Sequence, residues 1–303
     1  MYMHPFLEQL DHVEALATAP KWRRLWHAPG KYLYAIGFRQ LVYARTRQGV
    51  IKTVPTFFGL PMRVVLPAGT DIYLTGGKSH GSEIRLARFL VHTLRPGQQF
   101  LDIGGHFGYF SLLASRLVGP SGQVRAYEAS RSTYAVLAEN VRGQATIEAV
   151  NQAVSDCQET ITFYEFPVLY NEFNSMDVSQ FEGEKWFRDF RPTRLDIPAT
   201  RLDDILAQDE TGPAIIKIDV EGAEEKVIRG GLDSLRRLQP VVVMEYLEPR
   251  RHNASHRQAA ALLQHLGYRP HSLDAAGHPV PCPSPDAFLK QHGYDSDNFV
   301  FVK

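Results

Sequence analysis

Cysteine is scarce in this sequence of 303 residues, where only Cys157 and Cys282 occur. Two cysteines without metal-ligand spacing exclude a disulfide framework and favour a reducing compartment. No apolar run approaches the length of a membrane span. Residues 1–16 carry acidic side chains where a signal peptide needs an uninterrupted apolar stretch. We therefore expect a soluble, cytoplasmic protein without a transmembrane segment.

An excess of either charge is also missing, since Lys and Arg together number 33, as do Asp and Glu. No overall field recruits nucleic acid, so a nucleic-acid partner is not expected. The apolar fraction of 44% is ordinary for a globular protein. The length predicts one large domain or a domain with an appendage.

The N-terminal region mixes helix and strand patterns. Residues 6–17 have helical apolar spacing, and the basic, aromatic segment 21–27 predicts a helix whose tryptophans pack on the core. Contact of that segment with a membrane surface or an anionic substrate is the alternative. Two apolar, β-branched runs in 62–77 predict a hairpin. We expect residues 1–78 to form an extension that packs on a main domain of residues 79–303.

From Ser82 onward, strand and helix patterns alternate. Helices are predicted at 82–94, 108–118, 133–142, 224–238 and 255–266, and strands at 99–105, 123–130, 145–155, 159–166, 214–220, 240–247, 268–273 and 298–303. Such alternation is typical of parallel βαβ units in an open, doubly wound α/β sheet. Sheets of this kind bind ligands at the carboxyl ends of their strands.

The motif FLDIGGHFGYFS (100–111) predicts a strand that turns sharply into a helix around glycines. A dinucleotide fingerprint beginning at Gly104 requires glycine where the chain has His106 and Tyr109, which argues against a nicotinamide-dependent oxidoreductase. The spacing D-x-G-x-x-x-G, with an acid ending the strand, instead suits S-adenosylmethionine. A glycine turn that binds nothing is the alternative. The candidate cofactor contacts on the turn are Asp102, Gly104, Gly105, His106 and Gly108.

Further candidate cofactor contacts follow the other strands. Glu128 ends the second strand, where an acid can accept hydrogen bonds from both ribose hydroxyls. Gln152 or Asp156, after the third strand, could meet the adenine amine, and both could equally be turn formers. Glu83, in the first turn of the predicted helix 82–94, completes the candidate set.

Three charged residues, Lys217, Asp219 and Glu221, follow the fourth strand and share one side of it by alternation. Their burial costs free energy unless they are paired or contact a ligand. Capping of the next helix by an acid and pairing of Lys217 are the alternatives. Glu245, which ends the fifth strand, is a further candidate, with a salt bridge as its alternative role.

Several of these motifs resemble those of the FkbM family of class I methyltransferases. The resemblance covers roughly residues 80 to 250 and rests on FLDIGGHFGYFSLLAS, VRAYEAS, RLDDIL, VVVMEY and, most specifically, IIKIDVEGAEEKVIRGG. It implies a Rossmann-like sheet of seven strands and methyl transfer from S-adenosylmethionine, usually to a hydroxyl. Acceptors in the family include sugars of glycans and glycolipids and macrolide hydroxyls.

Carried onto this chain, the resemblance places Asp102, Gly104 and Gly108 at the methionine and ribose region and Glu128 on the ribose. It places Asp219 and Glu221 at the transfer face. The chain departs from the family pattern Gly-Ala-Asn at Gly104-Gly105-His106, where histidine tolerates a left-handed backbone better than most residues. It also has Glu128-Ala129 in place of an acidic-Pro pair, which keeps the ribose acceptor.

These residues predict a mechanism. A hydroxyl nucleophile gains from a nearby base, so we expect Glu221 or Asp219 as the base and Glu245 as an orienting group. The alternative is a Mg²⁺ ion held by Asp219, Glu245 and His252.

The acceptor is expected to be a sugar, glycan or glycolipid, with a natural product such as a macrolide as the nearest alternative. A non-catalytic glycan-binding protein is more remote. The aromatic segment 163–190, which includes Tyr164, Tyr170, Phe173 and Trp186, either stacks on sugars or packs over the sheet edge. Segment 21–27 is a candidate for the opposite wall.

Overall fold

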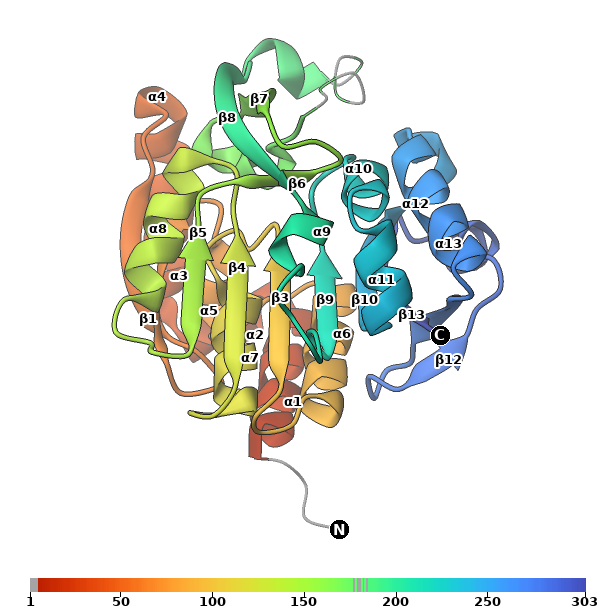
Figure 1. Cartoon of the computed structure of the whole chain (residues 1–303). Coiled ribbons are helices and arrows are strands. Elements are labelled where there is room, and N and C mark those ends of the chain that lie inside the picture. Colours follow the sequence, from red (N-terminus) through yellow and green to blue (C-terminus); the bar gives the residue numbers. More distant parts are fainter. Residues whose placement is uncertain (1–4, 177, 179–180, 182, 184) are drawn as a thin grey trace.

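The centre of the molecule is an eight-stranded sheet (Figure 1). The computed structural model describes residues 5–176, 178, 181, 183 and 185–303. The strand order is β12-β11-β13-β10-β9-β3-β4-β5. The strands span β3 Gln99–Ile103, β4 Gln123–Tyr127, β5 Ile147–Val150, β9 Ile215–Ile218, β10 Val241–Leu247, β11 Arg269–Leu273, β12 Pro279–Pro281 and β13 Ser296–Val302. The five strands from β5 to β10 are parallel, and β13, β11 and β12 are added antiparallel. The seven strands of the sheet that the family resemblance implies are present, and the short edge strand β12 is an eighth.

Helices cover both faces of this sheet, as expected for a doubly wound fold. One face packs against α6 Gly81–Thr93, α7 Tyr109–Val118 and α8 Arg131–Val141. The other carries α9 Leu202–Ile205, α10 Glu224–Arg229, α11 Leu232–Leu238, α12 Ala254–His265 and α13 Pro285–His292. Because side chains alternate along a strand, Phe100 enters the first core and Leu101 the second.

Two predicted elements are divided in the structure. The expected helix 224–238 is broken at Gly230 and Gly231. Glycine is required at 230, because a Cβ there would lie 2.1 Å from the carbonyl oxygen of Ser155. The expected strand 145–155 gives β5 and a separate β6 Ala153–Ser155. Strand β6 joins β7 Thr160–Glu165 and β8 Thr193–Arg201 in a small sheet, which lies beyond the carboxyl ends of the parallel strands (Figure 1).

The N-terminal part of the chain, residues 5–75, contains mainly helices and one hairpin. Its helices are α1 Pro5–Thr18, α2 Lys21–His27, α3 Pro29–Gly37, the π-helical η1 Phe38–Tyr43, α4 Ala44–Thr46 and α5 Thr70–Thr75. The hairpin predicted at 62–77 was wrong, since β2 Pro61–Leu66 pairs with the preceding β1 Val50–Pro55. In the turn between them, the Thr56 hydroxyl donates a 2.7 Å hydrogen bond to the Leu60 carbonyl oxygen. Residues 70–75, which were expected in the second strand, are helical.

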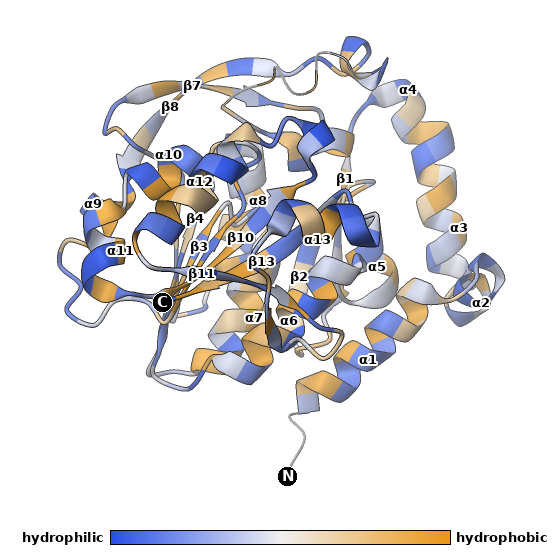
Figure 2. Ribbon diagram, turned by 90° about the vertical axis from the view of Figure 1, so that its right-hand side faces the viewer, coloured by the Kyte–Doolittle hydropathy of each residue, from blue (hydrophilic) through white to orange (hydrophobic). Residues whose placement is uncertain are grey.

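Helices α1 to α4 follow one another along one side of the molecule (Figure 2). Helix α1 is tied to α6 by the Arg88 guanidinium, which lies 2.5 Å from Asp11 and 2.7 Å from Glu14. The expectation that the tryptophans of 21–27 pack on the core was wrong, because Trp22 is 65% and Trp26 77% exposed. Among the described residues, no helix combines the length and apolar character of a membrane span.

Candidate active site

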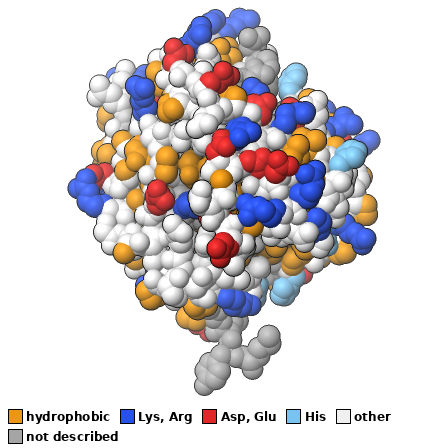
Figure 3. Space-filling model, in the orientation of Figure 1, with side chains coloured by type: hydrophobic (Ala, Val, Ile, Leu, Met, Phe, Trp, Pro, Cys, Tyr) orange, Lys and Arg blue, Asp and Glu red, His pale blue; other side chains and the backbone are white. Residues whose placement is uncertain are grey.

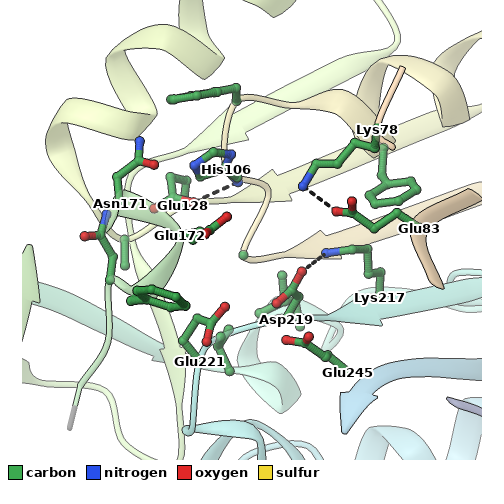
Figure 4. A pocket seen from close by; sticks show the side chains of 18 of the residues that line it. Lys78, Glu83, His106, Glu128, Asn171, Glu172, Lys217, Asp219, Glu221 and Glu245 are labelled. Carbon is green, nitrogen blue, oxygen red and sulfur yellow. Dashed lines mark hydrogen bonds and ion pairs between the residues drawn. The ribbon is translucent and has the colours of Figure 1, made fainter. Parts of the chain in front are cut away.

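A cavity of about 470 Å³ opens at the carboxyl ends of β3, β4, β9 and β10. This volume is within the range of small-molecule sites, about 300–1,000 Å³. The strand ends form its floor, residues 68–83 one wall, and residues 171–176 of the long segment before β8 another (Figure 4). The cavity therefore lies where a doubly wound sheet is expected to bind its ligand.

The glycine turn after β3 forms one edge of the cavity. Gly104, His106 and Gly108 all have positive φ, at 80°, 49° and 87°. A Cβ on Gly104 would lie 1.8 Å from the Asp219 carbonyl oxygen, and one on Gly108 2.6 Å from Leu137. His106 thus has the left-handed backbone that histidine tolerates better than most residues. Gly104 and His106 line the cavity, whereas Gly105 and Gly108 lie outside its lining and support the turn.

Glu128, at the end of β4, is anchored beside this turn. Its two carboxylate oxygens accept hydrogen bonds from the backbone N–H groups of His106 at 2.8 Å and Ser130 at 2.9 Å. Burial raises the pKa of Glu128 to about 7, although both hydrogen bonds oppose the shift. Each oxygen keeps a further lone pair, so the carboxylate can accept a hydroxyl hydrogen from the cavity side.

The His106 side chain lies at the tightest point of the turn and faces the cavity (Figure 4). Burial, with the nearby Lys78 ammonium, lowers its pKa to about 3, so the ring is neutral at physiological pH. Within the described part of the chain, its Nε2 and the Oδ1 of Asn171 have no hydrogen-bond partner. Buried polar atoms are usually satisfied, so these two fit a site completed by a polar ligand.

Lys217 of β9 joins two acids under the floor of the cavity. Its Nζ lies 3.1 Å from Asp219 and 3.6 Å from Asp102. Asp102 is 1% exposed, accepts a 2.6 Å hydrogen bond from Ser111, and lies outside the cavity lining. The structure thus brings Asp102 to Lys217 and the turn, which places it below the ligand space rather than on its surface.

The loop after β9 is held by Glu224, which accepts hydrogen bonds from the backbone N–H groups of Val220 and Gly222 at 3.3 and 3.2 Å. Glu224 also lies 3.3 Å from His256. Neither Asp219 nor Glu221 is needed to cap α10, and the side chains of both line the cavity.

Asp219, Glu221 and Glu245 form a cluster in which one carboxylate oxygen of each lies within 4.8 Å of the others. Burial opposes ionisation of Asp219, but Lys217 and Lys78 outweigh it and lower its pKa. Burial and the charge of Glu245 raise the pKa of Glu221 well above its ordinary value. Burial and Asp219 raise that of Glu245 to about 8. Asp219 is therefore the ionised member, and the other two hold protons readily.

The remaining predicted site residues divide between the cavity and its surroundings. Glu83 lines the cavity and lies 2.5 Å from Lys78 (Figure 4). Gln152 lines it as well, whereas Asp156 does not and accepts a 3.2 Å hydrogen bond from Ser155. His252 is not brought together with Asp219 and Glu245, since Glu221 occupies that position.

The long segment 163–190 supplies one wall and a cluster of its own, although residues 177, 179, 180, 182 and 184 lie outside the described residues. Tyr170 and Trp186 stack at 4.3 Å between ring centroids and do not line the cavity. Phe173 lines the cavity and also stacks on Trp186. Packing thus accounts for most of these aromatics, and the predicted wall at 21–27 is replaced by residues 68–83.

Several lining residues escaped the sequence analysis. Asp71 lies in the first turn of α5, Lys78 follows the end of that helix, and Ser296 and Asn298 lie on β13. The polar run Lys78-Ser79-His80 before α6 was a usable signal for Lys78. The β13 residues become visible only once β13 is known to lie beside β10, where Glu245 pairs with Asn298.

The raised pKa of Glu245 predicts a pH-dependent effect on stability. The folded protein keeps a proton on Glu245 up to about pH 8, whereas the unfolded chain loses it near the ordinary value of 4.5. Stability from this group is therefore fully present below about pH 4.5, decreases as the pH rises from there, and is lost once the pH has passed through 8. We expect Glu245→Gln to raise Tm by roughly 2–4 °C or more at about pH 9 and to change it little near pH 4. A Tm difference independent of pH, measured by calorimetry, would contradict this assignment.

In the central sheet, β13 is inserted antiparallel between β10 and β11. This strand order, with the glycine turn after β3 and Glu128 after β4, defines a class I, S-adenosylmethionine-dependent methyltransferase. Residues 102–270 match the family model of the Methyltransferase FkbM domain, which is more than half of the chain. The chain belongs to the FkbM methyltransferase family.

Similar solved structures include a methyltransferase FkbM from Methylobacillus flagellatus KT, with 15% identity, a TM-score of 0.40, and coverage of 78% of this chain and 53% of that chain. An Aeropyrum pernix fibrillarin with natively bound S-adenosyl-L-methionine has 13% identity, a TM-score of 0.40, and coverage of 72% and 74%. A Thermotoga maritima SAM-dependent O-methyltransferase has 13% identity, a TM-score of 0.41, and coverage of 83% and 77%. Among curated proteins, no sequence matches the chain.

Proposed function

We propose that this methyltransferase acts on a hydroxyl of a sugar, in a glycan or a glycolipid. The observation that carries the proposal is the carboxylate cluster of Asp219, Glu221 and Glu245 at the strand ends, beside a wall that can bond hydroxyls. That wall presents the polar side chains Asn171, Glu172 and Asn174, and Ser296 and Asn298 of β13 add to the lining. A polyhydroxylated acceptor can use many such donors and acceptors at once.

The charge of the cavity supports a neutral acceptor over an anionic one. Its lining includes seven carboxyl groups, namely Asp71, Glu83, Glu128, Glu172, Asp219, Glu221 and Glu245, against the basic side chains Lys78, Lys217 and Arg251, so acids remain in excess even with Glu221 and Glu245 protonated. A phosphodiester would be repelled by this balance, whereas a cationic methyl donor and a neutral sugar would not.

The residues present fit S-adenosylmethionine, which when bound supplies an electrophilic methyl group on a positively charged sulfur. Glu128 would hold the ribose hydroxyls and Gln152 the adenine edge. The Lys78–Glu83 ion pair is complementary to the carboxylate and ammonium of the methionine part. Asp102 would act through Lys217 rather than by direct contact.

Glu221 is the proposed general base. A base works best when its pKa approaches the working pH, and the pKa of Glu221 is raised whereas that of Asp219 is lowered by its ammonium partners. A positive charge in the cavity would favour the ionised carboxylate and so prepare Glu221 to accept a proton. Glu245 is proposed to orient the acceptor hydroxyl through a hydrogen bond.

The proposed function is tested by incubating the protein with methyl-tritiated S-adenosylmethionine and glycolipid or polysaccharide extracts. We expect tritium in a sugar methyl ether, which survives mild base and remains on the monosaccharide after acid hydrolysis. Label released by mild base as methanol would indicate an ester and contradict hydroxyl transfer. Label in a macrolide fraction alone would contradict the sugar acceptor.

The same assay tests the cation alternative. Asp219, Glu221 and Glu245 are spaced to offer oxygen ligands, but the function proposed for Glu221 requires no ion. We expect unchanged turnover in EDTA, and loss of turnover restored by Mg²⁺ would replace the base mechanism with a metal-assisted one.

A further inference from the structure

Basic residues are concentrated in one part of the chain. Residues 15–70 contain nine Lys and Arg and no Asp or Glu, although the whole chain has 33 of each kind. On the face of the molecule seen in Figure 3, in contrast, acidic and basic side chains are interspersed. The N-terminal helices α2 to α4 therefore carry a local positive charge that the net charge conceals.

Large apolar side chains are exposed on the same helices. Trp22 and Trp26 project from α2, which has no buried residue. Leu33 is 63% and Leu41 61% exposed, and Ile36 is exposed between them. Scattered single apolar residues need no explanation, but five within 20 residues, on α2 and on the helical run that follows Ala28, form a surface. We call residues 21–46 the amphipathic surface.

The geometry of this surface suits an interface plane. Helices α3, η1 and α4 run without a break from Pro29 to Thr46, about 27 Å at 1.5 Å per residue. Ala35, Phe38 and Tyr43 are the buried side that packs on the protein, so the opposite side is free to face outward. No described helix is long and apolar enough to span a bilayer, which leaves binding along its surface.

The basic side chains of the amphipathic surface are available for an external anion. Residues 21–46 contain six Lys and Arg, and none of them forms an ion pair with any residue that the structure describes. Elsewhere the structure pairs such groups, as in Arg88 with Asp11 and Glu14. The charge of the surface is therefore complementary to anionic headgroups.

We propose that the amphipathic surface of residues 21–46 docks on an anionic lipid bilayer. Tryptophan with Lys and Arg is the combination that favours the headgroup region of a bilayer. Each basic residue near such a surface adds to the attraction. A protein partner is less suited, because the core of a protein interface is depleted of Lys, which here lies among the apolar side chains.

The docked surface adjoins the wall of the cavity. Helix α5 lies against α3. The ring centroids of Tyr73 and Tyr34 are 6.3 Å apart, and the Lys31 Nζ lies 5.5 Å from the centroid of the Tyr73 ring. Asp71 and Ile72 of α5 line the cavity. Docking would therefore hold the cavity close to a membrane, which suits a lipid-borne sugar. That last step rests on the proposed function, whereas docking itself does not.

The experiment is co-sedimentation of the full chain with vesicles of phosphatidylcholine alone or mixed with phosphatidylglycerol, without any acceptor. We expect binding to the anionic vesicles, a blue shift of tryptophan fluorescence, and weakening by salt. Trp22→Ala with Trp26→Ala, and separately Lys21→Glu with Arg23→Glu and Arg39→Glu, should weaken binding on the order of 100-fold. Both variants should keep the parent Tm and methyl-donor binding, because these side chains are exposed.

The control variant, Val280→Ala with Lys290→Glu, changes exposed residues of the same types near the opposite end of the chain and should bind as the parent does. Equal binding of parent and surface variants, or no binding of the parent to anionic vesicles, overturns the proposal. A dimer that the surface variants convert to monomers, with vesicle binding unchanged, would assign the surface to self-association and also overturn it. Vesicle binding without sugar methylation would contradict only the proposed function.

Discussion

Replacing Glu221 by Gln is expected to lower turnover by about 10²- to 10⁴-fold, the range typical of losing a general base. The substitution keeps the shape and hydrogen-bonding size of the side chain but removes its ability to take the hydroxyl proton. The dissociation constant for S-adenosylmethionine, measured by calorimetry, should change by less than about threefold. Turnover is measured as S-adenosylhomocysteine formed in the presence of the acceptor.

Glu210→Gln is the matched control, because Glu210 is exposed on a loop away from the cavity lining. It should have the parent turnover. Full turnover of Glu221→Gln with unchanged cofactor affinity would exclude Glu221 as the base. Asp219→Asn tests a different role, because Asp219 is held ionised by Lys217 and Lys78. Its loss should weaken methyl-donor binding as well as turnover.

Replacing Gly104 by Ala is expected to abolish measurable binding of S-adenosylmethionine and to lower Tm. The added Cβ would lie 1.8 Å from the Asp219 carbonyl oxygen, so the ends of β3 and β9 must move apart. The φ of 80° adds strain of about 1–2 kcal/mol for a residue with a Cβ. Binding is measured by calorimetry and Tm by differential scanning calorimetry.

Gly105→Ala is the matched comparison, one residue along the same turn. Its added Cβ would meet Ala126 at 3.5 Å and Leu137 at 3.6 Å, which are ordinary contacts, and its φ is not positive. This variant should fold with a Tm close to the parent value. Equal Tm values and equal S-adenosylmethionine binding for Gly104→Ala and Gly105→Ala would contradict this account, because the close approach of residue 104 to Asp219 would then not require glycine.

The sequence predicted most of the sheet because its signals are local. Apolar runs marked β3, β4, β9 and β10, and the glycine spacing marked the turn after β3. The positive φ of His106 is compatible with its residue type, since histidine tolerates a left-handed backbone better than most residues. The meeting of Glu128 with the turn followed from the rule that parallel strands end at one edge.

Other features could not be predicted because they depend on contacts distant in sequence. The break of the expected helix at Gly230 accompanies its close approach to the Ser155 backbone, which lies far away in the chain. Asp102 was expected to touch the cofactor, but its position below Lys217 depends on the β3–β9 pairing. The exposure of Trp22 likewise could not be read from a pattern that fits a buried helix as well.

The central claim is that the turn after β3 and the acids after β4 and β9 form one methyl-donor site. A crystal structure of the protein with S-adenosylhomocysteine tests it most directly. We predict ribose hydroxyls bonded to Glu128, the amino-acid part beside Lys78 and Glu83, and the sulfur facing Asp219 and Glu221. A ligand bound outside this cavity, or one whose ribose does not contact Glu128, would contradict the account.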